Sequence, residues 1–144
     1  MDLAGVLSLV CAALFTGAAA YITIAEHPAR EGLDDGPMLA QWKPSYTRGF
    51  QMQASLAMAG FLLGVWTSYS TGDWRWLAGG LLLGANWPFT LFAILPINKQ
   101  LEAMSADDPA PELRSLMSRW GQLHSIRSTL GALSTLVFFW ALVT

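Results

Sequence analysis

The stretch Leu3–Ala25, LAGVLSLVCAALFTGAAAYITIA, contains no charged residue and is the first of four such apolar runs in the chain. As a helix with a rise of ~1.5 Å per residue it spans ~34 Å, enough to cross a hydrocarbon core of ~30 Å. The runs Phe50–Thr71, Trp76–Asn98 and Gly121–Thr144 have similar lengths, and Arg127 is the only charge in the last of them. The sequence therefore predicts a membrane protein made of helices.

The composition supports this class. Of 144 residues, 53% are hydrophobic and 12% are charged, which is too apolar for an ordinary soluble domain. We expect one all-α transmembrane domain over residues 1–144, an up-down-up-down four-helix bundle with helices near 3–26, 47–70, 74–98 and 112–143. The net charge of −2 and the lack of a basic patch give no reason to expect nucleic-acid binding. The single cysteine, Cys11, excludes an intramolecular disulfide.

The positive charges predict the orientation in the bilayer. Lysine and arginine gather in two connections, as Arg30, Lys43 and Arg48 in the first and as Lys99, Arg114 and Arg119 in the second. The remaining loop holds only Arg75. Because positive residues favour the cytoplasmic side, we expect the two longer connections inside and both termini outside. The N-terminal region before the first run has no positive charge, so this run is expected to be a retained helix rather than a cleaved signal peptide.

Four ionisable residues lie at the inner edge of the predicted membrane: Glu26, His27, His124 and Arg127. The uncharged stretch after Arg127 spans only ~26 Å as a helix, which places Arg127 at the edge of the hydrocarbon. Glu26 follows the first run directly and reaches a similar depth. Ionisable residues at membrane depth are costly and mark candidate functional sites.

Helical spacing predicts where the polar side chains point. Trp120, His124, Arg127 and Gly131 follow i, i+4, i+7 and i+11, which is one helix face. The other helices carry shorter polar faces, formed by Asn86, Thr90 and Asn98, by Arg48, Gln51 and Ser55, and by Thr16, Thr23 and Glu26. Since lipid cannot satisfy these groups, they are expected to face one another around a polar pocket open toward the cytoplasm.

Structural interpretations of the same residues remain open. Asn86 could satisfy the carbonyl of Gly84, which Pro88 leaves without its helical donor. Arg127 could reach toward the headgroups or form a structural ion pair with Glu26. The charges of Arg30, Lys43, Lys99 and Arg119 are explained by topology alone.

A metal centre is the less favoured arrangement. Two histidines with Glu26 would form a two-His-one-carboxylate set. However, Glu26 and His27 are adjacent, so on a helix their side chains point about 100° apart, and Arg127 would repel a cation. We therefore expect neither a metal nor another cofactor.

Three segments together resemble one known family. They are Glu26-His27-Pro28-Ala29-Arg30, the stretch from Trp87-Pro88-Phe89-Thr90 to Pro96-Ile97-Asn98-Lys99-Gln100-Leu101, and Trp120-x-x-x-His124-x-x-Arg127. This pattern is similar to the anthrone-oxygenase-like family of small four-helix membrane proteins. The resemblance implies oxidation of anthrones to anthraquinones with molecular oxygen and without a prosthetic group. It makes Glu26, His27, Asn98, Trp120, His124 and Arg127 the site candidates.

The residue types suit this chemistry. His124 or His27 would act as the base, with Glu26 beside them, and Arg127 would stabilise developing negative charge. Asn98 would donate a hydrogen bond to a small hydrophobic aromatic ligand and Trp120 would stack on it. The other residues expected to line the pocket are Asn86, Thr90, Gln51 and Arg48. Two alternatives stay open: a non-catalytic binder or carrier of a quinone or lipid, and a membrane redox protein with a metal or haem.

Overall fold

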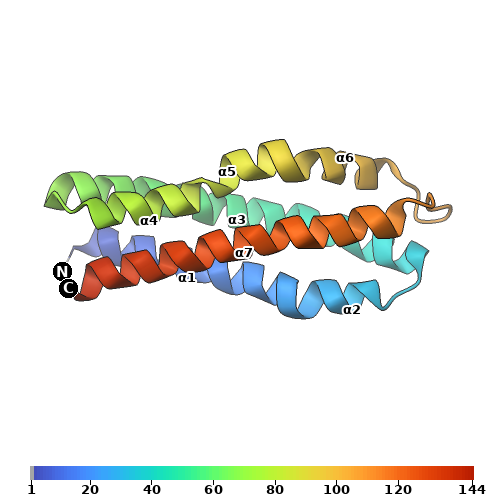
Figure 1. Cartoon of the computed structure of the whole chain (residues 1–144), viewed down its shortest axis with the longest axis horizontal. Coiled ribbons are helices and arrows are strands. Elements are labelled where there is room, and N and C mark those ends of the chain that lie inside the picture. Colours follow the sequence, from blue (N-terminus) through green and yellow to red (C-terminus); the bar gives the residue numbers. More distant parts are fainter. Residues whose placement is uncertain (1) are drawn as a thin grey trace.

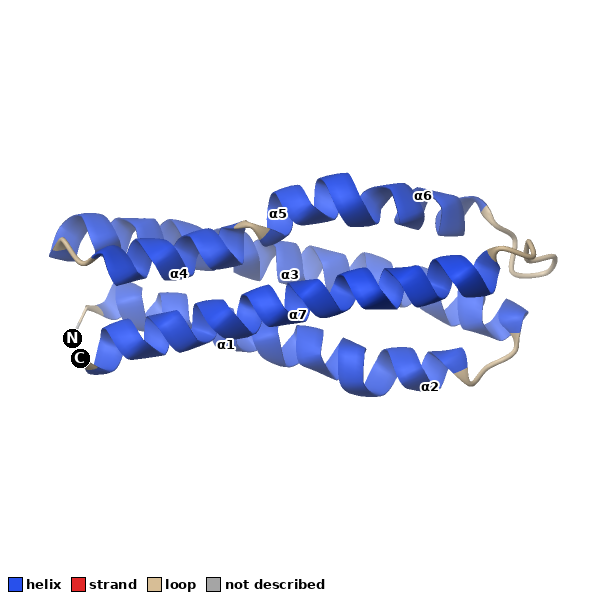
Figure 2. Ribbon diagram, viewed as in Figure 1, coloured by secondary structure: helices blue, strands red, loops and turns tan. Residues whose placement is uncertain are grey.

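The computed structural model describes residues 2–144, which form a bundle of four long helical segments (Figures 1 and 2). The first segment comprises α1 (Leu3–Tyr21), the π-helical turn η1 (Ile22–Glu26) and α2 (His27–Glu31), and the second is α3 (Asp35–Thr71). The third comprises α4 (Trp74–Gly84), α5 (Asn86–Phe89), η2 (Thr90–Ile94) and α6 (Leu95–Ala103), and the fourth is α7 (Leu113–Val143). The predicted all-α, up-down-up-down bundle is confirmed.

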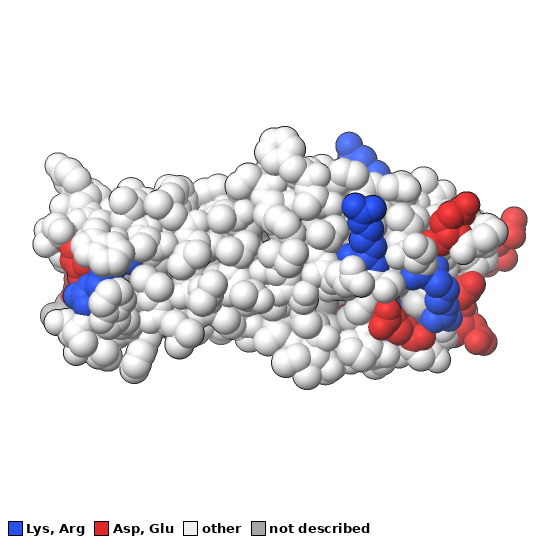
Figure 3. Space-filling view, viewed as in Figure 1, with Lys and Arg blue, Asp and Glu red and all other residues white. Residues whose placement is uncertain are grey.

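Three of the four segments are long and apolar enough to cross a membrane, namely Leu3–Glu31, Trp74–Ala103 and Leu113–Val143. The second segment, α3, is not in this group, so the expected span Phe50–Thr71 stays a prediction. Helix α3 begins at Asp35 rather than near residue 47, and it continues through Pro44 without a break. The second helix therefore extends into the connection that we expected between residues 26 and 47. Charged side chains gather at the two ends of the molecule, and the middle of the visible face is free of them (Figure 3).

The two ends of the bundle differ. Both termini and the turn at Gly72 and Asp73 lie at one end, which we call the terminal end; the two longer connections lie at the other, the charged end (Figure 1). Gly72 adopts a left-handed conformation, with φ of 75°, that ends α3. Asp73 caps α4 by accepting a hydrogen bond from the backbone N–H of Arg75. Hydrogen bonds from the Arg75 side chain hold the pKa of the Asp73 carboxyl below its usual value.

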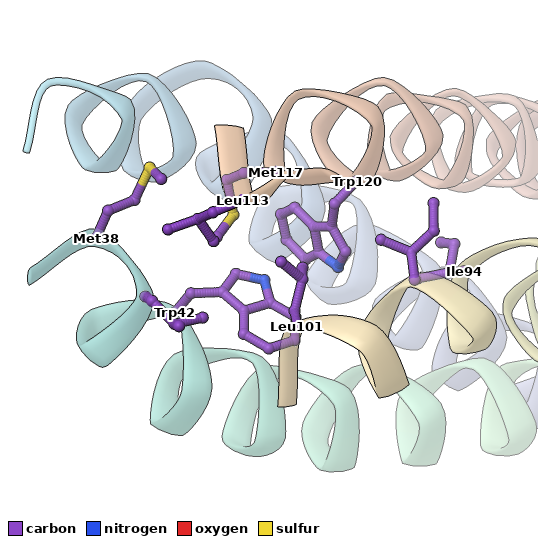
Figure 4. Packing of buried hydrophobic residues seen from close by; sticks show 9 residues of the cluster. Met38, Trp42, Ile94, Leu101, Leu113, Met117 and Trp120 are labelled. Carbon is purple, nitrogen blue, oxygen red and sulfur yellow. The ribbon is translucent and has the colours of Figure 1, made fainter. Parts of the chain in front are cut away.

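Glycines allow close helix contacts in the terminal half of the bundle. There, a Cβ on Gly79 would lie 2.6 Å from the Phe138 ring, and one on Gly60 would lie 2.5 Å from Leu83. Such small residues let helices approach closely. At the charged end, large side chains fill the space instead, and Figure 4 shows Trp42 from α3 and Trp120 from α7 beside Leu101 of α6. The α5–α6 part of the third segment also packs less closely on α7 than α4 does, which leaves room for a cavity there.

Two prolines explain the π-helical turns. Proline removes the backbone donor to residue i−4 and crowds its carbonyl. Pro28 comes two residues after the end of η1, and Pro96 comes two residues after the end of η2. In each case the residue just before the proline donates to the carbonyl five positions back, His27 to Ile22 and Leu95 to Thr90. The helix therefore continues past Pro28, where the sequence predicted its end. π-Helical turns are frequent at functional sites.

Candidate functional site

A small polar cavity lies inside the charged half of the bundle. All four helical segments contribute to its wall: Ile22, Arg30, Ser45, Tyr46, Gly49, Phe50, Gln53, Thr90, Ile94, Asn98, Trp120, His124 and Arg127. Its volume of about 20 Å³ is enough for one or two water molecules. We call it the inner cavity. Of the ten residues predicted to form the site, five line it: Thr90, Asn98, Trp120, His124 and Arg127.

The predicted face of α7 is buried. Trp120, His124 and Arg127 are exposed by only 4%, 2% and 6% of their surfaces. The imidazole of His124 stacks on the indole of Trp120, with ring centroids 5.0 Å apart and planes inclined by 22°. The indole N–H of Trp120 donates to Oδ1 of Asn98 over 3.0 Å. Helix α7 thus brings an imidazole and a guanidinium to the cavity, and α6 adds the amide of Asn98.

A chain of hydroxyl groups orients His124. Its Nδ1 lies 3.2 Å from Oγ1 of Thr23, which lies 2.8 Å from Oγ of Ser128. Ser128 in turn donates to the carbonyl of His124 over 3.4 Å. Because Ser128 donates to the carbonyl of His124, Thr23 must donate to Ser128. The three hydrogen bonds therefore form together only if the Nδ1–H of His124 donates to Thr23. That tautomer leaves Nε2 of His124 with a free lone pair.

Arg127 lies in this site without a counter-ion. None of the ion pairs among residues 2–144 includes Arg127, and its Nε has no hydrogen-bond partner. Its guanidinium carbon lies 5.6 Å from the centre of the Phe15 ring, which gives a cation–π contact. The ion pair with Glu26, which the sequence left open, is therefore not formed. The Arg127 side chain also does not extend to the surface, since it is only 6% exposed. A buried, unpaired guanidinium is suited to an anionic or carbonyl ligand.

Glu26 instead pairs with Arg30, one helical turn later. Arg30 Nη2 donates to Glu26 Oε1 over 2.9 Å, and the same oxygen accepts from Gln41 Nε2 over 3.0 Å and from the hydroxyl of Ser45. Arg30 is only 2% exposed and lines the inner cavity. Sequence reasoning assigned Arg30 to topology and missed it. The signal was available, because Glu26 and Arg30 have the i, i+4 spacing of an ion pair.

His27 lies near the site but does not line the inner cavity. It is helical and 7% exposed, and its Nε2 lies 3.4 Å from the carboxylate of Glu31. Its ring packs on Trp120, with centroids 5.4 Å apart, and against the bare Cα of Gly121. Both imidazoles thus contact Trp120, whose ring also receives the guanidinium of Arg30 at 5.6 Å. Protein groups cover the Trp120 ring, so in this arrangement it supports its neighbours rather than offering a free stacking face.

The remaining predicted residues divide into two groups. Asn86 and Thr90 are buried, at 2% and 3% exposure. Asn86 donates to the carbonyl of Leu83 rather than to that of Gly84, which was the structural alternative left open. Arg48 and Gln51, in contrast, are exposed on α3 and line no wall of the inner cavity. The inward face of α3 carries Gln53 instead, which is 1% exposed, whereas Gln51 lines an open groove on the outer side of α3.

The described residues offer no evident metal site. Among residues 2–144, no group of three His, Cys, Asp or Glu side chains is placed to hold a metal ion. The carboxylate of Glu26 is occupied by Arg30, Gln41 and Ser45.

Comparison with known proteins identifies the family. Residues 42–137 match the family model described as Anthrone oxygenase. The chain is also 34% identical over 108 residues to a curated anthrone oxygenase of Claviceps purpurea (strain 20.1), a match that covers 65% of this chain and 60% of the relative. The match thus spans somewhat less than two thirds of the relative's length. No solved structure matches the chain. From the family match over two thirds of its residues, we conclude that the chain belongs to the anthrone oxygenase family.

Proposed function

We propose that this protein is a membrane oxygenase that needs no cofactor and oxidises an anthrone-like, hydrophobic aromatic substrate at the inner cavity. The observation that carries the proposal is the pair of Arg127 and His124, a buried cation without a counter-ion and an oriented imidazole on one cavity wall. The family supports the reaction class.

The reaction requires a base, a cation and exclusion of water. In the proposed reaction, His124 Nε2 removes a proton from the CH2 group beside the ring carbonyl. Arg127 stabilises the resulting oxyanion. The electron-rich anion passes one electron to O2, and the two radicals combine to form a carbon–oxygen bond. The protonated His124 gives its proton to the resulting peroxide anion. Loss of the second CH2 proton and cleavage of the O–O bond then release water and leave a new carbonyl, so that one CH2 and one O2 yield one C=O and one H2O.

Oxygen uptake by the purified protein in nanodiscs tests the function. We expect uptake of one O2 per anthrone, formation of the anthraquinone, and rates above those of empty nanodiscs. Binding of anthrones without uptake would instead indicate a carrier. A visible absorption band or a stoichiometric metal would indicate a cofactor-bearing redox protein.

The hydroxyl chain predicts the effect of Thr23→Val. The substitution keeps the side-chain volume but removes the acceptor of the His124 Nδ1–H, so both tautomers become populated. We expect kcat to fall about tenfold with little change in KM, as for a positioning group rather than a ligand contact. Nitrogen-15 chemical shifts of the imidazole would report the tautomer. An unchanged tautomer and rate would show that the hydroxyl chain does not orient His124.

We propose further that the charged end faces the cytoplasm, because six of the eight lysine and arginine residues lie in its connections and adjoining helix ends. A reporter fused to the C-terminus, near the terminal end, is then expected to be active only if it works outside the cytoplasm. Activity of a cytoplasm-dependent reporter there would reverse the orientation.

A further inference from the structure

Three adjoining cavities lie between the outer surface of the bundle and His124. A second small cavity, which we call the side cavity, lies between α3 and the α5–η2 segment and shares Phe50, Thr90 and Arg127 with the inner cavity. Toward the outside it shares Ala54 and Trp87 with an open groove along α3. These adjacent cavities thus extend from the exterior of the bundle to His124 and Arg127.

The break in the third segment creates this opening. After α4 ends at Gly84, the chain turns before α5, and the α5–α6 part runs farther from α7 than α4 does (Figure 1). Trp87 bridges the opening, since its indole N–H donates to the carbonyl of Ala54 over 3.2 Å. That carbonyl belongs to a continuous helix, so the bond can be released without unravelling α3.

The opening faces the hydrocarbon of the bilayer rather than water. Most side chains around it are apolar, including Leu91 at 47% and Met58 at 39% exposure, while Gln51 and Ser55 are the polar residues of the groove. It lies near the middle of α3, while the charged residues gather toward the ends of the molecule (Figure 3). A solute that enters here must come from the lipid phase.

Residues in the walls of these cavities carry buried polar atoms without partners. Asn86, Thr90 and Arg127 line the side cavity, and Gln53 lines the inner cavity. Each has one such buried atom: Asn86 Oδ1, Thr90 Oγ1, Arg127 Nε and Gln53 Oε1. None of these four atoms has a hydrogen-bond partner in residues 2–144. Buried polar atoms of this kind normally have one. They offer two amide acceptors, one hydroxyl and one cationic donor. A lipid acyl chain satisfies none of them, whereas a ligand with hydroxyl groups and a carbonyl satisfies all.

We propose that the side cavity is the entrance and outer binding subsite for a flat, hydroxylated aromatic ligand that arrives from the bilayer. Phe50, shared by both cavities and only half-buried, is the partition that moves aside. At about 10 and 20 Å³, the two cavities can hold such a ligand only after Phe50 has moved aside and the helices around them have widened. The class of ligand in this inference rests on the proposed function, whereas the position of the entrance rests on the cavities.

Photolabelling in nanodiscs tests the entrance directly. The probe is an azido-anthraquinone, competed by an excess of 1,8-dihydroxyanthraquinone. We expect competed adducts on the segments 50–54 and 87–91. Adducts confined to the groove of Tyr21, Ala25, Glu26, Ala29, Arg30, Leu33 and Gln41 at the charged end would overturn the proposal in favour of entry from that side. The absence of any competed adduct would overturn it as well.

A blocking substitution separates entry from chemistry. Ala54→Trp fills the opening and is expected to lower kcat/KM at least tenfold. Ala13→Trp, on an exposed position of α1 that lines none of these cavities, is expected to change it less than twofold. Equal rates in the two variants would overturn the proposal and leave the oxygenase function standing. Competed adducts at the opening in a protein that consumes no oxygen would leave the entrance standing and overturn the oxygenase.

Thr90→Val tests recognition of the hydroxyl group. We expect the preference for a hydroxylated over an unsubstituted anthrone to fall about tenfold, since a site built for a hydroxyl group discriminates through it. Because Thr90 Oγ1 has no partner in residues 2–144, thermal stability should not fall. An unchanged preference would remove Thr90 from the subsite.

Discussion

Arg127→Met is expected to abolish most of the activity while making the protein more stable. The substitution keeps a long side chain but removes a buried charge that no carboxylate balances within residues 2–144. Desolvation of such a charge opposes folding, so we expect the free energy of unfolding to rise by about 1 kcal/mol. The loss of oxyanion stabilisation should lower kcat by about 10²–10³-fold.

Arg30→Met is the matched control, because Arg30 is a second buried arginine on the same cavity. It differs in having a partner, and its removal leaves Glu26 without its counter-ion. Breaking such a pair costs about 3 kcal/mol, so this variant is expected to be less stable than the wild type. Unfolding curves and oxygen uptake of both variants test whether Arg127 has a catalytic or a structural role. A fall in stability for Arg127→Met similar to that for Arg30→Met, with turnover retained, would make Arg127 a structural residue.

The opposite roles of these arginines show what the sequence could and could not reveal. Composition and run lengths predicted the bundle, and the i, i+4, i+7 spacing predicted that Trp120, His124 and Arg127 share a buried face. Both depend on local periodicity, which a sequence displays directly. Which residue Glu26 pairs with does not depend on local periodicity. Glu26 lay at the right depth for either arginine, and only the packing of η1 against α3 shows that it bonds to Arg30, Gln41 and Ser45.

The exposure of Arg48 and Gln51, which we expected to face inward, has a related cause. Arg48 and Gln51 form a polar face with the correct spacing, but the length of the helix sets its rotation against its neighbours. The sequence suggested that helix 2 begins near residue 47, after Pro44. Since α3 in fact starts at Asp35, its register is fixed by Met38, Leu39 and Trp42 in the core of the charged end. That register turns Gln53 inward and leaves Arg48 and Gln51 exposed.

His124→Phe is expected to reduce turnover by about 10²–10⁴-fold, the usual contribution of a general base. Phenylalanine retains an aromatic ring that can stack on Trp120, so the fold should persist while the acceptor Nε2 is lost. His27→Phe provides the control, since it alters the other imidazole on Trp120 but not the wall of the inner cavity. We expect this control to change the rate less than tenfold.

Chemical rescue separates lost chemistry from lost structure. His124→Ala removes the ring and leaves a space of imidazole size beside Arg127, so added imidazole should restore part of the oxygen uptake. No rescue is expected for Arg127→Met, in which a base is present but the oxyanion has no cation. If His27→Phe is inactive and His124→Phe is active, the base is His27, and the hydroxyl chain of Thr23 and Ser128 then serves packing alone. Full activity in both phenylalanine variants would exclude histidine as the base.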